Sequence, residues 1–246
     1  QPSYHFLWAF FSAFWYRFPS RKLVVVGVTG TKGKTTTVEL IHSILASSGA
    51  KVASLSSLRF KIGDQEIKNE YKMTMPGRGF MQKFLADAAR AGSRYAVLEV
   101  TSQGIQQFRH RFIRFSAAVM TNVAPEHIEA HGSFEKYLRA KLDLFWRLPK
   151  DGVAIINRDD PHADRFAAAT AAHKVFYDPS GVRTNGEIWR VEDADARGGI
   201  KFTFASDKQD VNGPKRIAVS SALEGQFNLF NILAAAGFGL MIPDSG

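Results

Sequence analysis

One segment of the sequence combines glycines, a lysine and a run of hydroxyl side chains in an order that suits a bound triphosphate. It reads Gly30-Thr-Lys-Gly33-Lys34-Thr35-Thr36-Thr37 and directly follows the apolar run Leu23–Val28. Glycines let backbone N–H groups approach phosphate oxygens, and a helix N-terminus adds the positive end of its dipole. In such a loop the Lys34 ammonium reaches the β- and γ-phosphates, and the Thr35 hydroxyl holds Mg²⁺. The segment is a variant of the strict phosphate-loop pattern, because Val28 stands where that pattern has its first glycine, and it predicts a nucleotide site.

Three further side chains are candidates to join this loop, although each has an ordinary alternative. Glu99 ends an apolar run, and a carboxylate at the carboxyl end of a parallel strand faces the ligand crevice, where it could hold Mg²⁺. Taken alone, a surface salt bridge is an equal alternative for it. His127 on its own is more often a hydrogen-bonded loop residue. Lys141 would by default be solvated, or paired with Asp143 or Asp151. Their positions relative to the loop favour a functional role.

The helices and strands that must position these residues follow a sequence pattern that predicts an α/β fold. From residue 23 onwards, short apolar runs alternate with helical periods, which is typical of a mostly parallel sheet flanked by helices. We expect strands at Leu23–Val28, Val52–Leu55, Tyr95–Val100, Ala117–Thr121, Val153–Ile156 and Lys174–Tyr177. We expect helices at Lys34–Ser48, Gly79–Ala91, Phe134–Leu148, Asp164–Ala172 and Phe227–Leu240. Small antiparallel hairpin inserts are predicted at Arg59–Ile67 and within Glu187–Val219.

Composition limits the class of protein. With 246 residues and 45% hydrophobic content the chain can bury a core, which excludes disorder. The 32 Lys+Arg against 23 Asp+Glu give a net charge of +9, which favours anionic partners such as nucleotides, nucleic acid or acidic lipid. The absence of cysteine excludes disulfides, thiolate metal ligands and a cysteine nucleophile, and it agrees with a cytoplasmic location.

The N-terminal stretch is aromatic. The segment Phe6–Tyr16 is shorter than the roughly 20 apolar residues of a membrane span, so we expect a helix over residues 1–19 that Pro19 ends. This helix would dock on the domain or on a missing neighbour. Alternatively, it would be an interfacial anchor or the tail of a truncated membrane span, with residues 4–18 docking on a membrane surface or a partner. Residues 20–246 show no internal linker and are expected to form one domain. Because the chain stops just after a helical pattern, we expect that a further C-terminal domain has been cut off.

Taken together, these residues resemble the Mur ligase family, the ATP-dependent amino-acid ligases of peptidoglycan synthesis, and most resemble the branch that extends the UDP-N-acetylmuramoyl-dipeptide. The matching segments occur in family order. They are Gly30–Thr36, Thr74-Met-Pro76, Leu98–Ser102, Gln107-Phe-Arg109, Thr121-Asn122, Glu126-His127, His131-Gly132, Ala140-Lys141, Ile156–Asp160 and Gly225–Asn231.

The resemblance implies an activity and a role for individual residues. An amino acid would be joined to a muramyl-peptide or related carboxylate through an acyl phosphate, with ATP and Mg²⁺. The ATP-binding residues would be Gly30, Thr31, Lys32, Gly33, Lys34, Thr35, Thr36, Asn228 and Asn231. The Mg²⁺ ligands would be Thr35, Glu99, His127 and a carbamylated Lys141, while Lys34, Lys141 and His127 would serve catalysis. The substrate-binding residues would be Thr74, Met75, Thr101, Gln107 and Arg109. The incoming amino acid would be held largely by the C-terminal domain, so this stretch alone would bind ATP without completing ligation.

Three positions depart from the family pattern. Lys32 replaces an asparagine, Met75 replaces the second threonine of Thr-Thr-Pro, and Gln103 stands where a histidine is common. The last two bear on the identity of the acceptor and not on the ATP chemistry.

Two other functions fit parts of the sequence. A γ-glutamyl ligase of the folylpolyglutamate or poly-γ-glutamate type shares the loop and the lysine, and substrate assays separate it from the muramyl branch. A nucleic-acid-stimulated or regulatory P-loop ATPase would grip phosphates with the basic cluster Arg109–Arg114. Its binding to DNA or RNA would depend steeply on salt and would stimulate the ATPase. No recognition helix or stacking motif for nucleic acid is present, so the predicted partners are small molecules.

Overall fold

The frame of the protein is one twelve-stranded sheet. The computed structural model describes residues 2–71, 73–126, 131–184, 186–195, 197–210 and 213–241. The strand order across the sheet is β12-β11-β10-β9-β8-β7-β6-β1-β5-β2-β3-β4. The strands are β1 (Val24–Thr29), β2 (Val52–Leu55), β3 (Arg59–Ile62), β4 (Gln65–Lys68), β5 (Tyr95–Glu99), β6 (Ala117–Met120), β7 (Val153–Asn157), β8 (His173–Asp178), β9 (Gly181–Thr184), β10 (Glu187–Asp195), β11 (Ile200–Asp210) and β12 (Gly213–Ser221).

The centre of this sheet is parallel and its two edges are antiparallel. Strands β8, β7, β6, β1, β5 and β2 pair in parallel, whereas β3 and β4 on one side and β9 to β12 on the other pair antiparallel. The central strands are rich in valine, isoleucine and alanine because helices cover both of their faces. In register, Val28 of β1 lies opposite Glu99 of β5. The end of β1 therefore delivers the chain beside that carboxylate.

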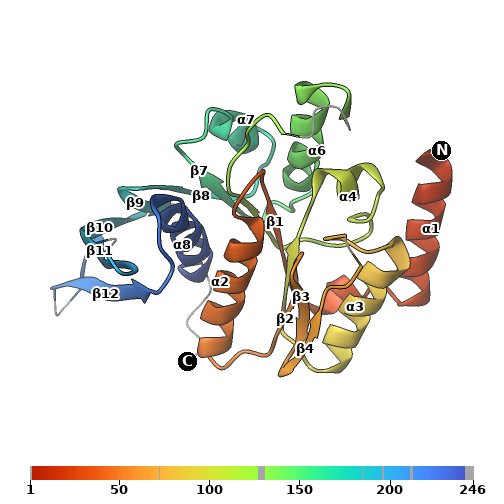
Figure 1. The fold of residues 1–246 in the computed structure, drawn as a ribbon, viewed down its shortest axis with the longest axis horizontal. Coiled ribbons are helices and arrows are strands. Elements are labelled where there is room, and N and C mark those ends of the chain that lie inside the picture. Colours follow the sequence, from red (N-terminus) through yellow and green to blue (C-terminus); the bar gives the residue numbers. More distant parts are fainter. Residues whose placement is uncertain are drawn as a thin grey trace.

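Helices cover the two faces of the parallel centre. Helices α2 (Lys34–Ser47) and α8 (Gln226–Gly239) contact each other on one face, as Figure 1 shows. The other face is covered by α3 (Arg78–Arg90), α6 (Phe134–Trp146) and α7 (Ala163–Ala168), and the short α4 (Ser102–Gln106) contacts α6. Consecutive residues of β1 point to opposite faces of the sheet, so Val25 belongs to one core and Val26 to the other. Both cores thus hold the carboxyl end of β1 in place.

Helix α1 (Pro2–Trp15) lies at the edge of the molecule, beyond α3, and a 3₁₀ turn, η1 (Pro19–Lys22), leads from it into β1 (Figure 1). Its small residues Ala9 and Ala13 are buried, and α1 contacts α3. The Phe6 and Phe10 rings meet the Phe112 ring edge-on. Among the described residues, no helix is long and apolar enough to cross a membrane.

The α/β class and the six central strands agree with the sequence prediction, but three details differ. The predicted hairpin inserts are not separate decorations, because β3, β4 and β10 to β12 extend the main sheet at both edges. The helix expected at Asp164–Ala172 ends at Ala168, since the Thr170 hydroxyl accepts the Ala172 amide and turns the chain. Neither β9 nor α4 was expected from the sequence.

Candidate active site

The loop after β1 is held in shape by the end of β6. The Thr31 amide donates to the Asn122 carbonyl at 2.8 Å, and the Lys32 amide donates to the Asn122 side chain at 3.0 Å. The Thr121 hydroxyl donates to the Lys32 carbonyl at 2.7 Å. A Cβ atom on Gly30 would lie 1.9 Å from that hydroxyl oxygen, so the position accepts only glycine. These contacts fix the backbone that would face a phosphate.

The second loop glycine is enclosed by α8. Gly33 precedes α2 with φ at +82°, and a Cβ atom there would lie 2.2 Å from Asn231 Oδ1. The buried Asn231 donates to Asn228 Oδ1 at 3.0 Å, which orients its amide. Beside this contact a cavity of about 340 Å³ opens, lined among others by Phe227 and Phe230. Both asparagines assigned to the nucleotide therefore stand next to the loop, but on its α8 side.

A second cavity, of about 520 Å³, lies on the other side of the loop, and we call it the loop cavity. It is lined by residues 30–36 together with Glu99, Thr74, Thr101 and Lys141. These side chains come from the loop after β1 and the start of α2, from the end of β5, from the segment before α3, from the N-cap of α4 and from α6. Residues about 110 positions apart in the sequence are thus brought into one cavity at the carboxyl edge of the parallel strands, where α/β sheets bind ligands.

Glu99 is 3% exposed and faces the loop. Its Oε2 accepts hydrogen bonds from the Thr35 hydroxyl at 2.8 Å and from the Ser57 amide at 2.9 Å. The Ser57 hydroxyl lies 2.8 Å from the Thr35 hydroxyl. The surface salt bridge considered above is therefore not its environment, and one carboxylate and two hydroxyls gather at one point.

Lys141 is buried in the cavity wall, 1% exposed, and its Nζ donates to the Gly30 carbonyl at 2.6 Å. It does not pair with Asp143, which accepts from His110. Burial, helped by the nearby Lys34 cation, lowers the pKa of Lys141 to about 7. Burial also lowers the pKa of Lys34, whose ammonium donates to the Thr31 carbonyl at 2.8 Å. The cavity thus holds two amines whose charged forms are destabilised.

With this geometry in hand, comparison with known proteins identifies the family. The profile described as the Mur ligase middle domain matches residues 28–239. A UDP-N-acetylmuramoyl-L-alanyl-D-glutamate–2,6-diaminopimelate ligase from Chlamydia pneumoniae is 34% identical over 234 residues, which are 95% of this chain and 46% of that relative. The chain belongs to the Mur ligase family.

Other members are similar over the same stretch. A UDP-N-acetylmuramyl-tripeptide synthetase of Roseiflexus sp. (strain RS-1) is 34% identical over 91% of this chain and 45% of its own length. A solved UDP-N-acetylmuramoyl-L-alanyl-D-glutamate–2,6-diaminopimelate ligase superposes with a TM-score of 0.73 at 28% identity, covering 90% of this chain and 44% of that chain. The apo form of L. casei FPGS, at TM-score 0.71 and 17% identity over 94% of this chain and 61% of its own, shares the fold. This Mur ligase chain spans about half the length of the curated relatives it matches.

The residues predicted to bind the acceptor separate into two groups in this Mur ligase chain. Thr74 and Thr101 line the loop cavity, and the Thr101 hydroxyl caps α4 by accepting the Gly104 amide at 3.1 Å. Met75 is buried, with its sulfur 3.4 Å from the Thr101 amide. Arg109 donates to the Met75 carbonyl and to Gln107 Oε1. Gln107 and Arg109 are not among the described residues that line the cavity, so they adjoin its wall from outside.

Several residues that shape the site were not assigned a role by the sequence analysis. Tyr137 contacts both the loop and Lys141. Its hydroxyl is 2.8 Å from the Thr31 hydroxyl, and its ring centre is 4.4 Å from Lys141 Nζ. Ser57 faces Glu99 from the loop after β2. The spacing Tyr137 to Lys141, one helical turn, was the only local signal for the first, and nothing local marked Ser57.

His127, predicted as a metal ligand and catalytic residue, lies outside the described residues. The basic cluster invoked for a nucleic-acid-stimulated ATPase is occupied by protein contacts, since Arg111 lies 5.6 Å from the Phe6 ring centre and Arg109 holds Met75. This arrangement gives no support to the ATPase alternative.

Proposed function

We propose that this chain is the ATP-handling part of a ligase that joins an amino acid to a UDP-muramyl-peptide carboxylate in the cytoplasm. The observation that carries the proposal is the single cavity that holds the loop of residues 30–36, the Glu99–Thr35 pair and the buried Lys141. Family membership and the 34% identity to a diaminopimelate ligase support the acceptor class.

The chemistry follows from the poor leaving ability of a carboxylate oxygen. The acceptor carboxylate attacks the γ-phosphorus of ATP, ADP leaves, and an acyl phosphate forms. The amino group of the incoming residue then attacks the acyl carbon, phosphate leaves, and the amine gives up a proton as the amide forms. In this scheme the backbone N–H groups of the loop orient the phosphates, and Lys34 leaves the Thr31 carbonyl to neutralise charge on the transferring group.

The residues that face Glu99 fit a magnesium ion. The Glu99 carboxylate and the Ser57 hydroxyl each lie within hydrogen-bond distance of the Thr35 hydroxyl, and carboxylate and hydroxyl oxygens are ligands that Mg²⁺ prefers. When bound, Mg²⁺ would offset the negative charge of the phosphates. Thr35 and Glu99 are the residues of this group that we assign to it, and His127 is the further ligand implied by the family pattern.

We also propose that Lys141 is carbamylated. A lysine with a pKa of about 7 has about half of its amine in the neutral form at neutral pH, and only the neutral amine attacks CO₂. The nitrogen lone pair would bond to the carbon of CO₂ and one N–H proton would pass to solvent, which leaves an anionic carbamate. An anion here would offset the Lys34 cation, which already disfavours a positive charge at Lys141. Carbon-13 NMR under labelled CO₂ should give a carbamate resonance that Lys141→Ala removes.

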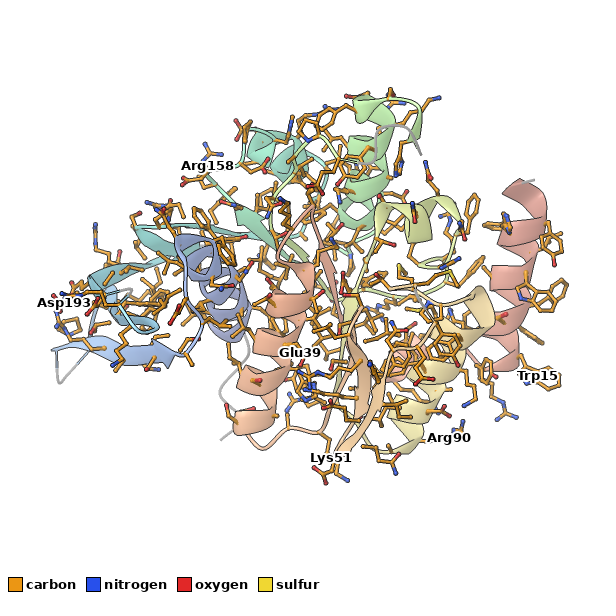
Figure 2. All side chains as sticks on the ribbon, viewed as in Figure 1. Trp15, Glu39, Lys51, Arg90, Arg158 and Asp193 are labelled. Atoms are coloured by element: carbon orange, nitrogen blue, oxygen red, sulfur yellow. The ribbon has the colours of Figure 1, made fainter. Side chains whose placement is uncertain are left out.

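Calorimetry with Mg-ATP tests the nucleotide site. Lys34→Ala should abolish binding while circular dichroism stays unchanged, because the fold does not depend on the Lys34 ammonium. Lys51→Ala is the matched control, since this exposed lysine lies at the opposite end of the sheet (Figure 2). Unchanged ATP affinity in Lys34→Ala would refute the assignment of the loop.

The acceptor is tested separately with the full-length protein. We expect ATP-dependent product from a UDP-muramyl-dipeptide and an amino acid, and none from a folate or oligo-γ-glutamate acceptor. The reverse result would favour the γ-glutamyl alternative, whose solved representative shares the fold at 17% identity.

A further inference from the structure

Helix α1 presents a large apolar surface to solvent. Six large side chains, each at least 52% exposed, form what we call the outer face of α1: Tyr4, Leu7, Trp8, Phe11, Phe14 and Trp15. At about 100° per residue they fall within an arc of about 120°. Trp15, 80% exposed, points away from the rest of the molecule in Figure 2. Nothing in the described part of the chain covers this face.

The opposite face of α1 is already used. Ala9 and Ala13 are buried, and Phe6 and Phe10 pack against the Phe112 ring. A helix that is apolar all round is normally buried on all sides. The outer face of α1 is therefore a surface that lacks its partner, rather than a consequence of how the helix docks on its own domain.

The charges around the helix indicate what that partner is. Residues 1–38 contain no aspartate or glutamate, and the exposed cations Arg17, Arg21 and Lys22 follow the helix directly. A cavity of about 350 Å³ at this end is lined by Trp15, Arg17, Lys22 and Arg90 among others, with no carboxylate in its lining.

One carboxylate lies near this end, and it does not balance the cations. Asp87 bonds both Lys83 and Arg90 on α3, so two cations already share it. The aromatic face is therefore bordered by uncompensated positive charge, which suits an anionic surface. A second copy of the chain would bring the same cations against one another, which disfavours self-association through this face.

We infer that α1 docks this protein on the surface of an anionic lipid bilayer. The opposite face of the helix is packed on its own domain through Ala9, Ala13 and the Phe112 ring, so only the outer face of α1 is available to lipid. The helix lies in the plane of the surface, with the outer face of α1 at the boundary between headgroups and acyl chains, where tryptophan and tyrosine are favoured. Arg17, Arg21 and Lys22 contact the lipid phosphates. This docking is independent of the nucleotide site.

Flotation with lipid vesicles tests the inference. The chain should float with phosphatidylglycerol–phosphatidylcholine vesicles, less so at high salt, and should remain at the bottom with pure phosphatidylcholine. Tryptophan emission should shift to the blue on addition of the anionic vesicles, which reports on the unaltered protein. Absence of flotation, or equal flotation with both lipids, would overturn the inference.

Variants separate the apolar and the charged contributions. Trp8→Ser/Trp15→Ser should abolish flotation, whereas Ile217→Ser on β12, at the other end of the molecule in Figure 1, should not. Since each cation at an anionic surface contributes about a five-fold factor, Arg17→Gln/Lys22→Gln should weaken partition about 25-fold.

The matched charge control is Lys215→Gln/Arg216→Gln, which removes two exposed cations from β12 and should leave partition unchanged. Mg-ATP affinity should be the same in all four variants, which checks that they fold. Flotation of the tryptophan variant at the level of the unaltered protein would refute the inference. The inference would also be refuted if the unaltered protein did not bind vesicles but formed a dimer in light scattering, and if the tryptophan variant were monomeric.

Discussion

Replacing Lys141 with methionine tests whether the cavity holds a buried amine that weakens the fold. Methionine keeps the length of the side chain and removes the ionisable group. Burial, with the Lys34 cation, lowers the pKa of Lys141 from its ordinary 10.5 to about 7. Between these values the unfolded chain binds a proton that the folded chain does not, so stability rises with pH across this window.

The magnitude follows from that difference. Keeping the lysine costs about 4 kcal/mol of unfolding free energy at pH 7 and about 2 kcal/mol at pH 9. Methionine avoids this cost but loses the hydrogen bond from Nζ to the Gly30 carbonyl, which contributes about 1–2 kcal/mol. We therefore expect Lys141→Met to be more stable than the unaltered protein by about 2–3 kcal/mol at pH 7 and by about 0–1 kcal/mol at pH 9.

Urea titrations at both pH values, in buffer free of CO₂ and Mg²⁺, measure this difference. Lys136→Met, an exposed position on the same helix, should change stability by less than about 0.5 kcal/mol at either pH. Ligase activity of the full-length Lys141→Met protein should be lost although the fold is stronger. A variant less stable than the unaltered protein at pH 7, or a difference that does not change with pH, would refute the reasoning.

Two other changes test the loop and the support of α6. Gly33→Ala should weaken Mg-ATP binding about tenfold or more in calorimetry, because its Cβ would lie 2.2 Å from Asn231 Oδ1. The control is Gly49→Ala, where φ is +81° and the space around the residue is open. It should cost about 1 kcal/mol of stability and leave binding unchanged. Asp143→Ala should lower the unfolding free energy by about 2–4 kcal/mol, since it leaves the buried His110 without the carboxylate that lies 2.6 Å from its Nε2. Although burial opposes it, hydrogen bonds from His110 and a neighbouring arginine lower the pKa of Asp143, so this loss should shrink in urea titrations as the pH falls below about 4.

The parallel centre of the sheet was predictable because its strands are buried on both faces and so appear as unbroken apolar runs. The antiparallel edges were recognised as hairpins, but their joining to the main sheet was not. On one side β3 pairs directly with β2, and on the other the joining depends on β9, which is only four residues long, pairs with β8 and β10 and leaves no periodic signal. Short strands are specified by their neighbours more than by their own sequence.

The candidate site, too, was predictable only in part. The loop was recognisable because glycine, lysine and threonine occur within seven adjacent residues. Its support was not, because Tyr137 reaches Thr31 across 106 positions and Ser57 approaches Glu99 across 42. The assignment of Arg109 to the acceptor comes from the family pattern and stays a prediction, and the pattern gave no sign that its guanidinium donates to the Met75 carbonyl. Side-chain direction depends on packing that the sequence pattern does not contain.

The same long-range support bears on the order in which the nascent chain can fold. Strand β1 does not pair with β2, the next strand to leave the ribosome, but with β5 and β6. The loop of residues 30–36 also depends on later parts of the chain, because its Lys32 amide donates to Asn122 and its Thr31 hydroxyl pairs with the Tyr137 hydroxyl. More than half of the 246 residues must emerge before these contacts form. A nucleotide therefore has no finished binding site to stabilise during early synthesis. Until residue 112 has emerged, Phe6 and Phe10 of α1 also lack the Phe112 ring, and their apolar surface is open to association with other chains.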